Sequence, residues 1–323
     1  MTITTAPPAR RVLVDCVQAA TAAPSLHNSQ PWAFRFRRGG VDVYADPHRR
    51  LRVLDPAGRE QLISVGAALF TLRLALRQAG YRSDVTLFPA PEDPDLVARV
   101  TAIHPAAVTP AVEALAAAIP HRHTNRRPFA QTHVPAAVLE QLRDAARKEG
   151  VALAVASAPA RDAILGMARS ADRWLRARPG YRHELARWTG HDLRYDGVPA
   201  AAAGPWDALE TVPIRDFTEL SSAPRPSEQF EPYPTILVLT TDGDQRADWL
   251  RAGQALQRVL LTATWQGLAT TPISQPVEVP AVRRMLIDPG AGLSVQMVLR
   301  VGYGSPVGRT PRRPLADVLL ARV

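Results

Sequence analysis

The spacing of hydrophobic residues predicts a chain in which helices alternate with strands. Apolar positions three and four residues apart predict helices over residues 10–22, 59–79, 110–118, 137–148, 161–177, 247–266 and 279–286. Alternating or short β-branched runs predict strands over residues 33–37, 41–45, 85–88, 96–103, 151–156, 235–240 and 293–301, with a short strand or turn over 268–273. This mixture indicates an α+β fold, with antiparallel-rich sheets flanked by helices.

Two pairs of predicted helices match each other along the chain. The pair Val12-Leu13 recurs 126 residues later, and a Gly-x-Ala-Leu stretch that begins at Gly66 recurs 187 residues later. The second copy is therefore longer than the first. We predict an internally duplicated chain, a pseudo-dimer, with one half at residues 1–119 and the other at residues 120–323.

The additional residues of the second half fall in an irregular stretch over residues 180–232. This stretch is rich in Gly, Pro and Ala, and it contains aromatic residues such as Trp188 and Phe217. A long irregular segment in a compact domain is usually functional, most often as a lid. A disordered linker is the alternative, which the aromatic residues disfavour.

Only the first half contains the polar loop Pro-Ser-Leu-His-Asn-Ser-Gln-Pro-Trp, at residues 24–32. Pro24 ends the preceding helix, and the second proline forces extended geometry on Gln30. The side chains of Ser25, Asn28 and Gln30 donate and accept hydrogen bonds, which suits a flat polar ligand. The same residue types also cap turns when no ligand is present.

Only the second half contains clusters of arginine before its first helix and after its last strand. The first cluster comprises Arg122, Arg126 and Arg127, and the second extends from Arg309 to Arg313. A solvated charged face is the alternative interpretation. Because each half keeps what the other lacks, we predict one site that the two halves share.

Composition excludes several classes of protein. The 46% of hydrophobic residues is ordinary for a soluble core, and no apolar run reaches the roughly 18 residues that a membrane span needs. Residues 1–11 lack the apolar region of a secretory signal, so we expect a cytoplasmic protein. Cys16 is the only cysteine, which excludes an internal disulfide, and its apolar neighbours favour a buried core residue over a nucleophile.

The net charge of +9 does not predict a nucleic-acid partner. Lys148 is the only lysine, and the arginines are spread along the chain without forming a stripe or a nucleic-acid-binding motif. We therefore expect a small-molecule partner, with no nucleic acid and no membrane.

No metal site is predicted either. His121 and His123 lack a third ligand nearby. The stretch Asp242-Gly243-Asp244 lacks the remainder of a calcium loop, which favours a helix cap there.

Four sequence elements occur in a fixed order. They are Pro24-Ser25-x-x-Asn28-x-Gln30-Pro31-Trp32; Arg122-x-Thr124-x-Arg126 with Phe129; Gly267-x-x-Thr270-Thr271-Pro272-Ile273; and Gly302-Tyr303-Gly304 followed by Arg309 and Arg312. Together they resemble the flavin-dependent nitroreductase superfamily, specifically its single-chain Acg-like branch, over nearly the whole chain. The resemblance implies an FMN at the interface of two nitroreductase-like halves.

The resemblance also implies which residues contact FMN. The phosphate and ribityl chain are assigned to Arg122, Thr124, Arg126 and Arg312, with Arg309 as an additional contact. Several guanidinium groups can satisfy a dianionic phosphate through bidentate, charge-assisted hydrogen bonds. The isoalloxazine ring is assigned to the loop of the opposite half, through Pro24, Ser25, Leu26, Asn28 and Gln30. Since the first half lacks the arginine motif, one FMN per chain is expected.

The turn at residues 272–275 is expected to lie against the ring, through Pro272 and Ile273, with a backbone N–H near the flavin N5. Many relatives have Glu-Gly where Ser274 and Gln275 stand here, so these two are the candidate catalytic residues. Hydride transfer itself needs no acidic side chain, because the cofactor carries that chemistry.

The implied function is an FMN-dependent oxidoreductase that moves hydride from NAD(P)H to a nitroaromatic, quinone or other conjugated acceptor by a ping-pong cycle. A closed lid would instead favour a protein that stores or sequesters FMN. A flavin-dependent desaturase of a biosynthetic pathway is a further alternative. The chain is expected to be a pseudo-dimeric monomer or a homodimer.

Overall fold

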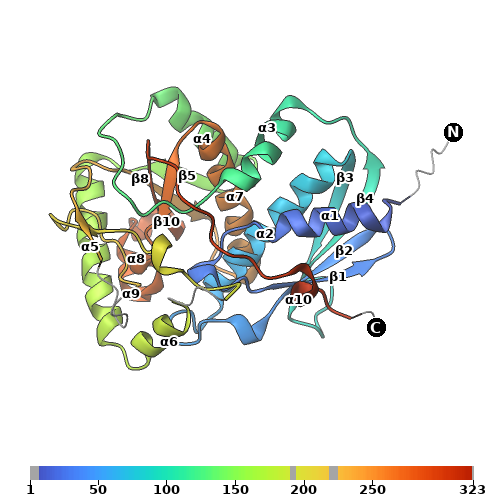
Figure 1. Cartoon of the computed structure of the whole chain (residues 1–323), viewed down its shortest axis with the longest axis horizontal. Coiled ribbons are helices and arrows are strands. Elements are labelled where there is room, and N and C mark those ends of the chain that lie inside the picture. Colours follow the sequence, from blue (N-terminus) through green and yellow to red (C-terminus); the bar gives the residue numbers. More distant parts are fainter. Residues whose placement is uncertain (1–6, 190–193, 218–224, 322–323) are drawn as a thin grey trace.

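The computed structural model describes residues 7–189, 194–217 and 225–321 and contains two four-stranded antiparallel sheets (Figure 1). The first has the strand order β1-β2-β4-β3. Its elements are α1 (Arg10–Ala20), β1 (Trp32–Arg37), β2 (Gly40–Ala45), α2 (Arg59–Gln78), β3 (Tyr81–Leu87) and β4 (Leu96–Pro105). Helix α3 (Pro110–Ala118) connects this half to the next.

The second sheet has the order β5-β8-β10-β9. Its strands are β5 (Ala152–Val155), β8 (Thr235–Thr241), β9 (Ala269–Pro272) and β10 (Ser294–Gly302). Its helices are α4 (Ala136–Arg147), α5 (Ala158–Ala177), α6 (Tyr181–Arg187), α7 (Arg246–Trp265), α8 (Gln275–Glu278), α9 (Pro280–Met285) and α10 (Leu315–Val318). The short strands β6 (Trp206–Asp207) and β7 (Ser227–Glu228) pair with each other.

The two sheets share one topology. In each half a helix precedes the first strand, a long helix joins the second strand to the third, and the strands lie in the order first, second, fourth, third. The α+β class predicted from the sequence is therefore correct. The shared order is what a duplication would leave, although the duplication and its boundary at residue 119 stay a prediction.

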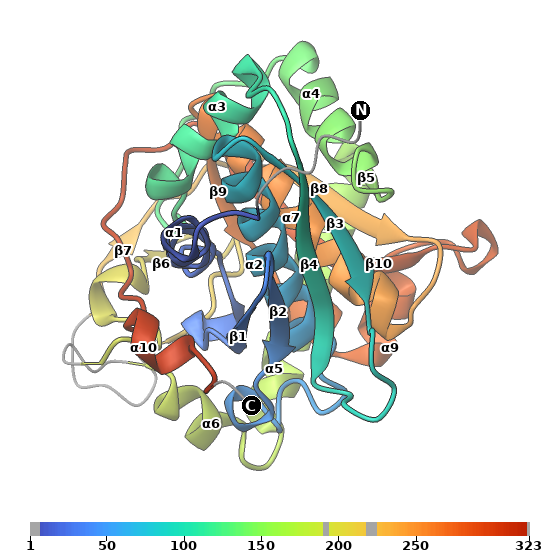
Figure 2. The ribbon, with the colours of Figure 1, turned by 90° about the vertical axis from the view of Figure 1, so that its right-hand side faces the viewer.

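The long helices α2 and α7 lie side by side between the two sheets (Figures 1 and 2). Each contributes a residue to the core of the other half, because Leu250 of α7 packs in the first cluster and Ile63 of α2 packs in the second. Gly66 and Gly253 face each other at the contact. A Cβ atom on Gly253 would overlap the carbonyl oxygen of Ile63 and lie 2.9 Å from the Cα atom of Gly66.

The predicted helices and strands agree with the structure within a few residues, except in three places. Helix α6 and the short strands β6 and β7 lie inside the stretch predicted to be irregular, α8 replaces part of a predicted turn, and α10 was not predicted in the tail. The described part of the insertion is folded onto the body of the protein. Trp188 and Phe217 are buried there against Leu51 and Leu54 of the first half, which rules out a disordered linker for these residues.

Two further expectations can be compared with the structure. Cys16 is buried in the core, and burial raises the pKa of its thiol to about 12, which agrees with a core residue and not a nucleophile. The expected helix cap at residues 242–244 is wrong. Gln245 caps α7 and forms a capping box with Asp248, while Asp244 accepts a hydrogen bond from the indole of Trp249.

The α2–α7 contact predicts a large difference between two glycine-to-alanine changes. Gly253→Ala should destabilise the protein by about 1–3 kcal/mol, because the new methyl group has no space. Gly166→Ala is the matched control, because Gly166 lies in α5 and a Cβ atom there would contact only Arg169, at 3.8 Å. It should stabilise by roughly 0.5–1 kcal/mol through helix propensity. Urea denaturation measures both, and equal effects would contradict the tight contact.

Candidate functional site

A cavity lies where the two halves meet, and both halves line it. The first half contributes residues 24–27 and one face of α2, and the second contributes Thr124, Arg126, part of α7 and residues 271–275. Residues 213–215 and Phe217 of the insertion form a further wall. The empty space amounts to about 840 Å³, open solvent at its mouth included.

The inner surface of the cavity is largely apolar. Ile63 and Ala67 come from α2, Leu256 and Leu260 from α7, and Met297 from β10. These side chains are available to the cavity because α2 and α7 pack closely and point neighbouring faces into the same space. A flat apolar ring with polar edges fits such a lining, since most ligand sites combine apolar walls with a few placed polar groups.

The polar loop of the first half has an unusual backbone. His27, Asn28 and Gln30 have φ values of 47°, 54° and 49°, a region that non-glycine residues seldom occupy. The extended geometry expected of Gln30 before Pro31 is therefore wrong. The Oγ atom of Ser25 accepts a hydrogen bond from the Gln30 N–H, and Ser64 of α2 accepts one from the Leu26 N–H. Strain of this kind persists where the surroundings fix it, and it clusters at functional sites.

Asn28 and Gln30 form hydrogen bonds to distant segments of the chain. Neither lines the cavity. The Asn28 amide donates to the carbonyl oxygens of Gly197 and Pro311, and the Gln30 amide donates to that of Tyr195 and accepts from the N–H of Arg313. These two residues tie the loop to the insertion and to the C-terminal tail, whereas Pro24, Ser25 and Leu26 do line the cavity, as expected of ring contacts.

His27 is a residue of the site that the sequence analysis did not identify. It lines the cavity, is 6% exposed, and neither ring nitrogen has a hydrogen-bond partner. Its ring meets the ring of Phe217 edge-on at 5.2 Å. Burial, and then the charges of Arg215 and Arg126, hold the pKa of His27 well below its usual value, so the imidazole is neutral. No spacing or motif distinguished it from its neighbours.

Arg122, which is 3% exposed, and Arg312, which is half-buried, form a pair of cations beside the cavity. Each donates to the carbonyl oxygen of Ala22, at 3.4 and 3.3 Å, and the Nε atom of each is buried without a partner. Among the described residues, neither has a carboxylate within ion-pair distance. Burial and the charge of Arg312 lower the pKa of Arg122 to about 9, and burial lowers that of Arg312 to about 10.

Such a pair is costly without an anion and favourable with one, because buried charges need a partner. The pair also lies next to the cavity along the chain. Ala22 is two residues before Pro24, and Arg122 is two residues before Thr124, both of which line the cavity. Arg309 is exposed, although its charge contributes to lowering the pKa of the nearby His123 to about 4, after burial and Arg122.

Arg126 is separated from that pair. It lines the cavity, donates to the carbonyl oxygen of Ala202 at 2.8 Å, and lies 4.7 Å from the ring centre of Phe217. Burial, then Arg215 and Arg225, lower its pKa to about 10. The arginines expected to act as one set are therefore divided between the cavity and the site beside it.

The turn at residues 272–275 lines the cavity as expected. Pro272 has no N–H, and the N–H of Ile273 donates to the carbonyl oxygen of Val298 at 2.9 Å. A backbone donor from this turn therefore comes from Ser274 or Gln275. Their side chains already contact the insertion, since the Gln275 amide donates to Pro213 and the Ser274 hydroxyl accepts from Arg215.

No group of three His, Cys, Asp or Glu side chains in the described part of the chain is placed to hold a metal ion. None of the described helices is both long enough and apolar enough to cross a membrane.

An α+β chain whose halves enclose an apolar cavity beside unpaired cations has the features of a protein that binds a flat, anionic cofactor. A family model described as Nitroreductase family matches residues 119–303. The chain belongs to the Nitroreductase family, which confirms the resemblance seen in its motifs.

Relatives from Mycobacterium tuberculosis extend the similarity over nearly the whole chain. Rv3131, whose name assigns it provisionally as an NAD(P)H nitroreductase, is 36% identical over 313 residues, covering 93% of this chain and 88% of the relative. Acg, whose name carries the same provisional assignment, is 33% identical over 317 residues and 96% of each chain. Rv3127, named as an uncharacterized protein, is 33% identical over 327 residues, covering 96% of this chain and 93% of its own.

Among solved structures, the FMN-dependent nitroreductase NfnB from Mycobacterium smegmatis, in complex with NADPH, matches 65% of this chain and 99% of its own. The two are 18% identical with a TM-score of 0.38. The family assignment rests on the sequence relatives and not on this match.

Proposed function

We propose that this protein is an FMN-dependent oxidoreductase of the nitroreductase type, which takes hydride from NAD(P)H and reduces a flat conjugated acceptor. The observation that carries the proposal is the pair of arginines, Arg122 and Arg312, beside a largely apolar cavity. The Nε atom of each is buried without a partner, and neither arginine has an ion-pair partner among the described residues. One end of FMN is a dianionic phosphate and the other is a flat ring, so the two parts of the site match the two ends of the cofactor. The names of Rv3131 and Acg support the same activity.

In this proposal Arg122 and Arg312 hold the phosphate, and Thr124 marks the path of the ribityl chain into the cavity. The guanidinium groups have free Nε atoms with which to bind phosphate oxygens. Arg309, which is exposed, would act at the outer edge of the phosphate site. Because the second half alone contributes these arginines, we propose one FMN per chain, with the chain acting as its own pseudo-dimer.

The ring would lie in the cavity between elements of both halves. Residues 24–26 would contact it from the first half, and Pro272 and Ile273 from the second. Arg126 would face a polar edge of the ring, because it is the one member of the predicted arginine set that lines the cavity. A backbone N–H of Ser274 or Gln275 would be the donor near the ring.

Bound FMN would supply hydride acceptance from NAD(P)H and hydride donation to the acceptor. The residues of the chain have other tasks. The apolar lining excludes water, which strengthens each electrostatic contact inside. His27, neutral and without a partner, can donate one hydrogen bond and accept another from a ligand in the cavity. Nitroaromatics and quinones fit this setting because they are flat and become anionic as they are reduced.

One observation favours the alternative of FMN storage. Residues 213–215 and Phe217 of the insertion form one wall of the cavity. Arg215 holds that wall through an ion pair with Glu278 and a hydrogen bond to Tyr181. If this wall does not open, a second substrate cannot reach the flavin. The two candidate functions then differ in whether bound flavin turns over.

An anaerobic absorbance experiment separates them. The purified protein, reconstituted with FMN, is mixed with NADPH or NADH and then with a quinone. The proposal predicts that the flavin bands bleach with at least one nicotinamide and return with the quinone. Flavin bands that persist with both nicotinamides would favour storage, and a protein that retains no flavin after reconstitution would overturn the cofactor assignment.

The insertion wall gives a second prediction. Phe217→Ala should enlarge the cavity next to His27 and Arg126, so reoxidation of the reduced protein by a bulky quinone should become faster. Phe230→Leu is the matched control, because Phe230 is a buried residue of the same insertion that does not line the cavity. Stopped-flow absorbance gives both rates. An unchanged rate in Phe217→Ala would show that this wall does not limit access.

A further inference from the structure

Glu60 is a buried carboxyl group in the cavity that the assignment of FMN contacts leaves unused. It is the second residue of α2, lines the cavity, and is 3% exposed. Its Oε1 atom accepts a hydrogen bond from Nη2 of Arg59 at 2.6 Å, while its Oε2 atom is buried without a partner. An ionised carboxylate oxygen that is buried without a partner destabilises the fold. Protonation of the carboxyl group, or contact with a ligand, removes this cost.

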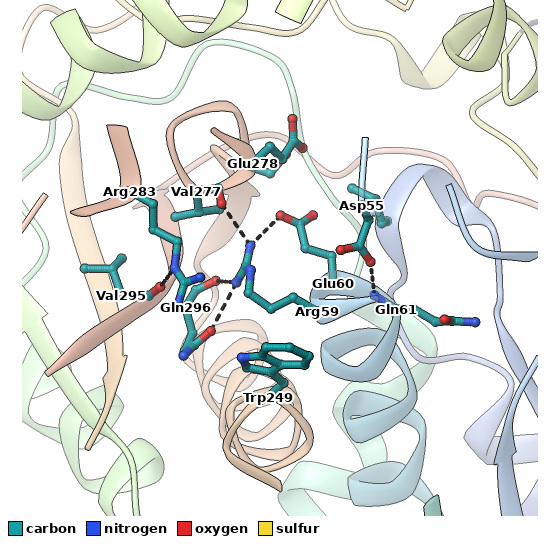
Figure 3. A network of polar contacts seen from close by, with 12 residues as sticks. Asp55, Arg59, Glu60, Gln61, Trp249, Val277, Glu278, Arg283, Val295 and Gln296 are labelled. Atoms are coloured by element: carbon teal, nitrogen blue, oxygen red, sulfur yellow. Dashed lines mark hydrogen bonds and ion pairs between the residues drawn. The ribbon is translucent and has the colours of Figure 1, made fainter. Parts of the chain in front are cut away.

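Arg59 fixes the position of Glu60 and also has other hydrogen-bond partners. Its guanidinium also donates to the carbonyl oxygen and the side chain of Gln296, at 2.8 and 3.1 Å, and to the carbonyl oxygen of Val277 at 3.2 Å. Figure 3 shows Arg59 between Gln296 and Glu60. The guanidinium is therefore held by neutral acceptors whether Glu60 is ionised or not.

A second buried carboxyl group lies close to the first. Glu278 of α8 accepts a hydrogen bond from Arg215, and its other oxygen, Oε1, is also buried without a partner. Figure 3 shows the carboxyl groups of Glu60 and Glu278 on the same side of Arg59. Two carboxyl groups in one dry region cannot both ionise cheaply, and one tends to keep its proton.

The charges around Glu60 oppose one another. Burial, then Glu278, and then Asp55 before α2, favour its neutral form, while Arg59 and Arg215 favour the ionised form. Arg283 of α9 interacts with it as well, although Arg283 is paired with Asp244. Burial outweighs the cations and raises the pKa of Glu60 to about 8. The carboxyl group thus keeps a proton at neutral pH.

We propose that Glu60 is the proton donor for the acceptor reduced in the cavity, with Glu278 as a positioning residue that keeps Glu60 protonated. This inference rests on the proposed function. When a quinone receives a hydride there, its oxygen becomes an anion. That oxygen takes the proton from Oε2 of Glu60, an O–H bond breaks as another forms, and the hydroquinone leaves. The Glu60 carboxylate, held by Arg59, regains its proton from water.

The first test does not depend on flavin chemistry. Infrared spectra of the full-length protein should show the C=O band of a protonated carboxyl at pH 7. The band should weaken as pH passes about 8, and Glu60→Gln should lack it. Glu149→Gln is the matched control, because Glu149 is a buried carboxylate outside the cavity that pairs with Arg73 and Arg258. It should leave the band unchanged.

The pH dependence of protein stability provides a second test of whether Glu60 carries a proton. A folded-state pKa above the unfolded value of 4.5 means that the folded protein binds the additional proton between pH 4.5 and about 8. The contribution of Glu60 to stability is therefore full below pH 4.5 and is lost as pH rises through that interval. In Glu60→Gln, this loss of stability between pH 4.5 and about 8 should be absent. The same pH dependence in wild type and variant would overturn the protonated state.

The catalytic role is tested on the FMN-loaded protein. Glu60→Gln should bind FMN and be reduced by NAD(P)H as the wild type is, while its reoxidation by a quinone should be at least about 100-fold slower. The wild-type rate should fall above about pH 8, and that fall should be absent in Glu60→Gln and return in Glu60→Asp. Unchanged reoxidation in Glu60→Gln would overturn the proposal. If NAD(P)H reduces the bound flavin in neither the wild type nor the variants, the proposed function is wrong and the donor role of Glu60 is wrong with it. The infrared band would still show whether Glu60 carries a proton.

Discussion

The contact between α2 and α7 is the constraint on which the rest of the structure depends. Gly66 and Gly253 let the two helix backbones approach so closely that Ile63 and Leu250 each enter the core of the opposite half. The same approach brings the polar loop of the first half and the turn at residues 272–275 of the second to one cavity. A wider spacing would separate the two halves of the site, so the packing of small residues is also what assembles it.

The presence or absence of a carboxylate partner distinguishes structural arginines from those of the site. Arg300 is fully buried, but Glu231 binds it with two hydrogen bonds of 2.6 Å, and Phe129 lies against its guanidinium group. Arg122 is buried and Arg312 is half-buried, and in the described part of the chain their hydrogen-bond partners are carbonyl or amide oxygens and a hydroxyl. A buried cation without an anion destabilises a fold. Arg215 and Arg300 have carboxylate partners, so an arginine of the site that lacks one indicates where a ligand supplies the charge.

Local patterns predicted much of this protein. Helical periodicity located α2 and α7 within one residue of their observed ends, because both are long and carry continuous apolar faces. The motifs also located Thr124, Arg126 and the turn at residues 272–275, since their neighbours in sequence are their neighbours in the site. What was missed depends on contacts between distant segments. Helix α6 is short and gains its burial from packing on the body of the protein.

The contacts of individual side chains also depend on distant segments of the chain. Asn28 and Gln30 have the chemistry of ligand contacts, yet in the structure they bind carbonyl oxygens of the insertion and carbonyl, amide and guanidinium groups of the tail, which no local pattern reveals. In the sequence, Glu60 is an ordinary acidic residue in the first turn of a helix. Its burial, its free oxygen and its proximity to Glu278 follow only once the two halves are packed together.

A flavin titration tests whether Arg122 and Arg312 make the cavity an FMN site. FMN and riboflavin share the ring and differ in the phosphate, so fluorescence titration of both isolates the contribution of the arginines. FMN should bind about 10- to 100-fold tighter than riboflavin, because hydrogen bonds to a charged group contribute roughly 1.5–3 kcal/mol. Arg122→Gln should remove that preference, and Arg127→Gln, at an exposed arginine of the same segment, should keep it. Equal affinities for the two flavins in the wild type would contradict the account.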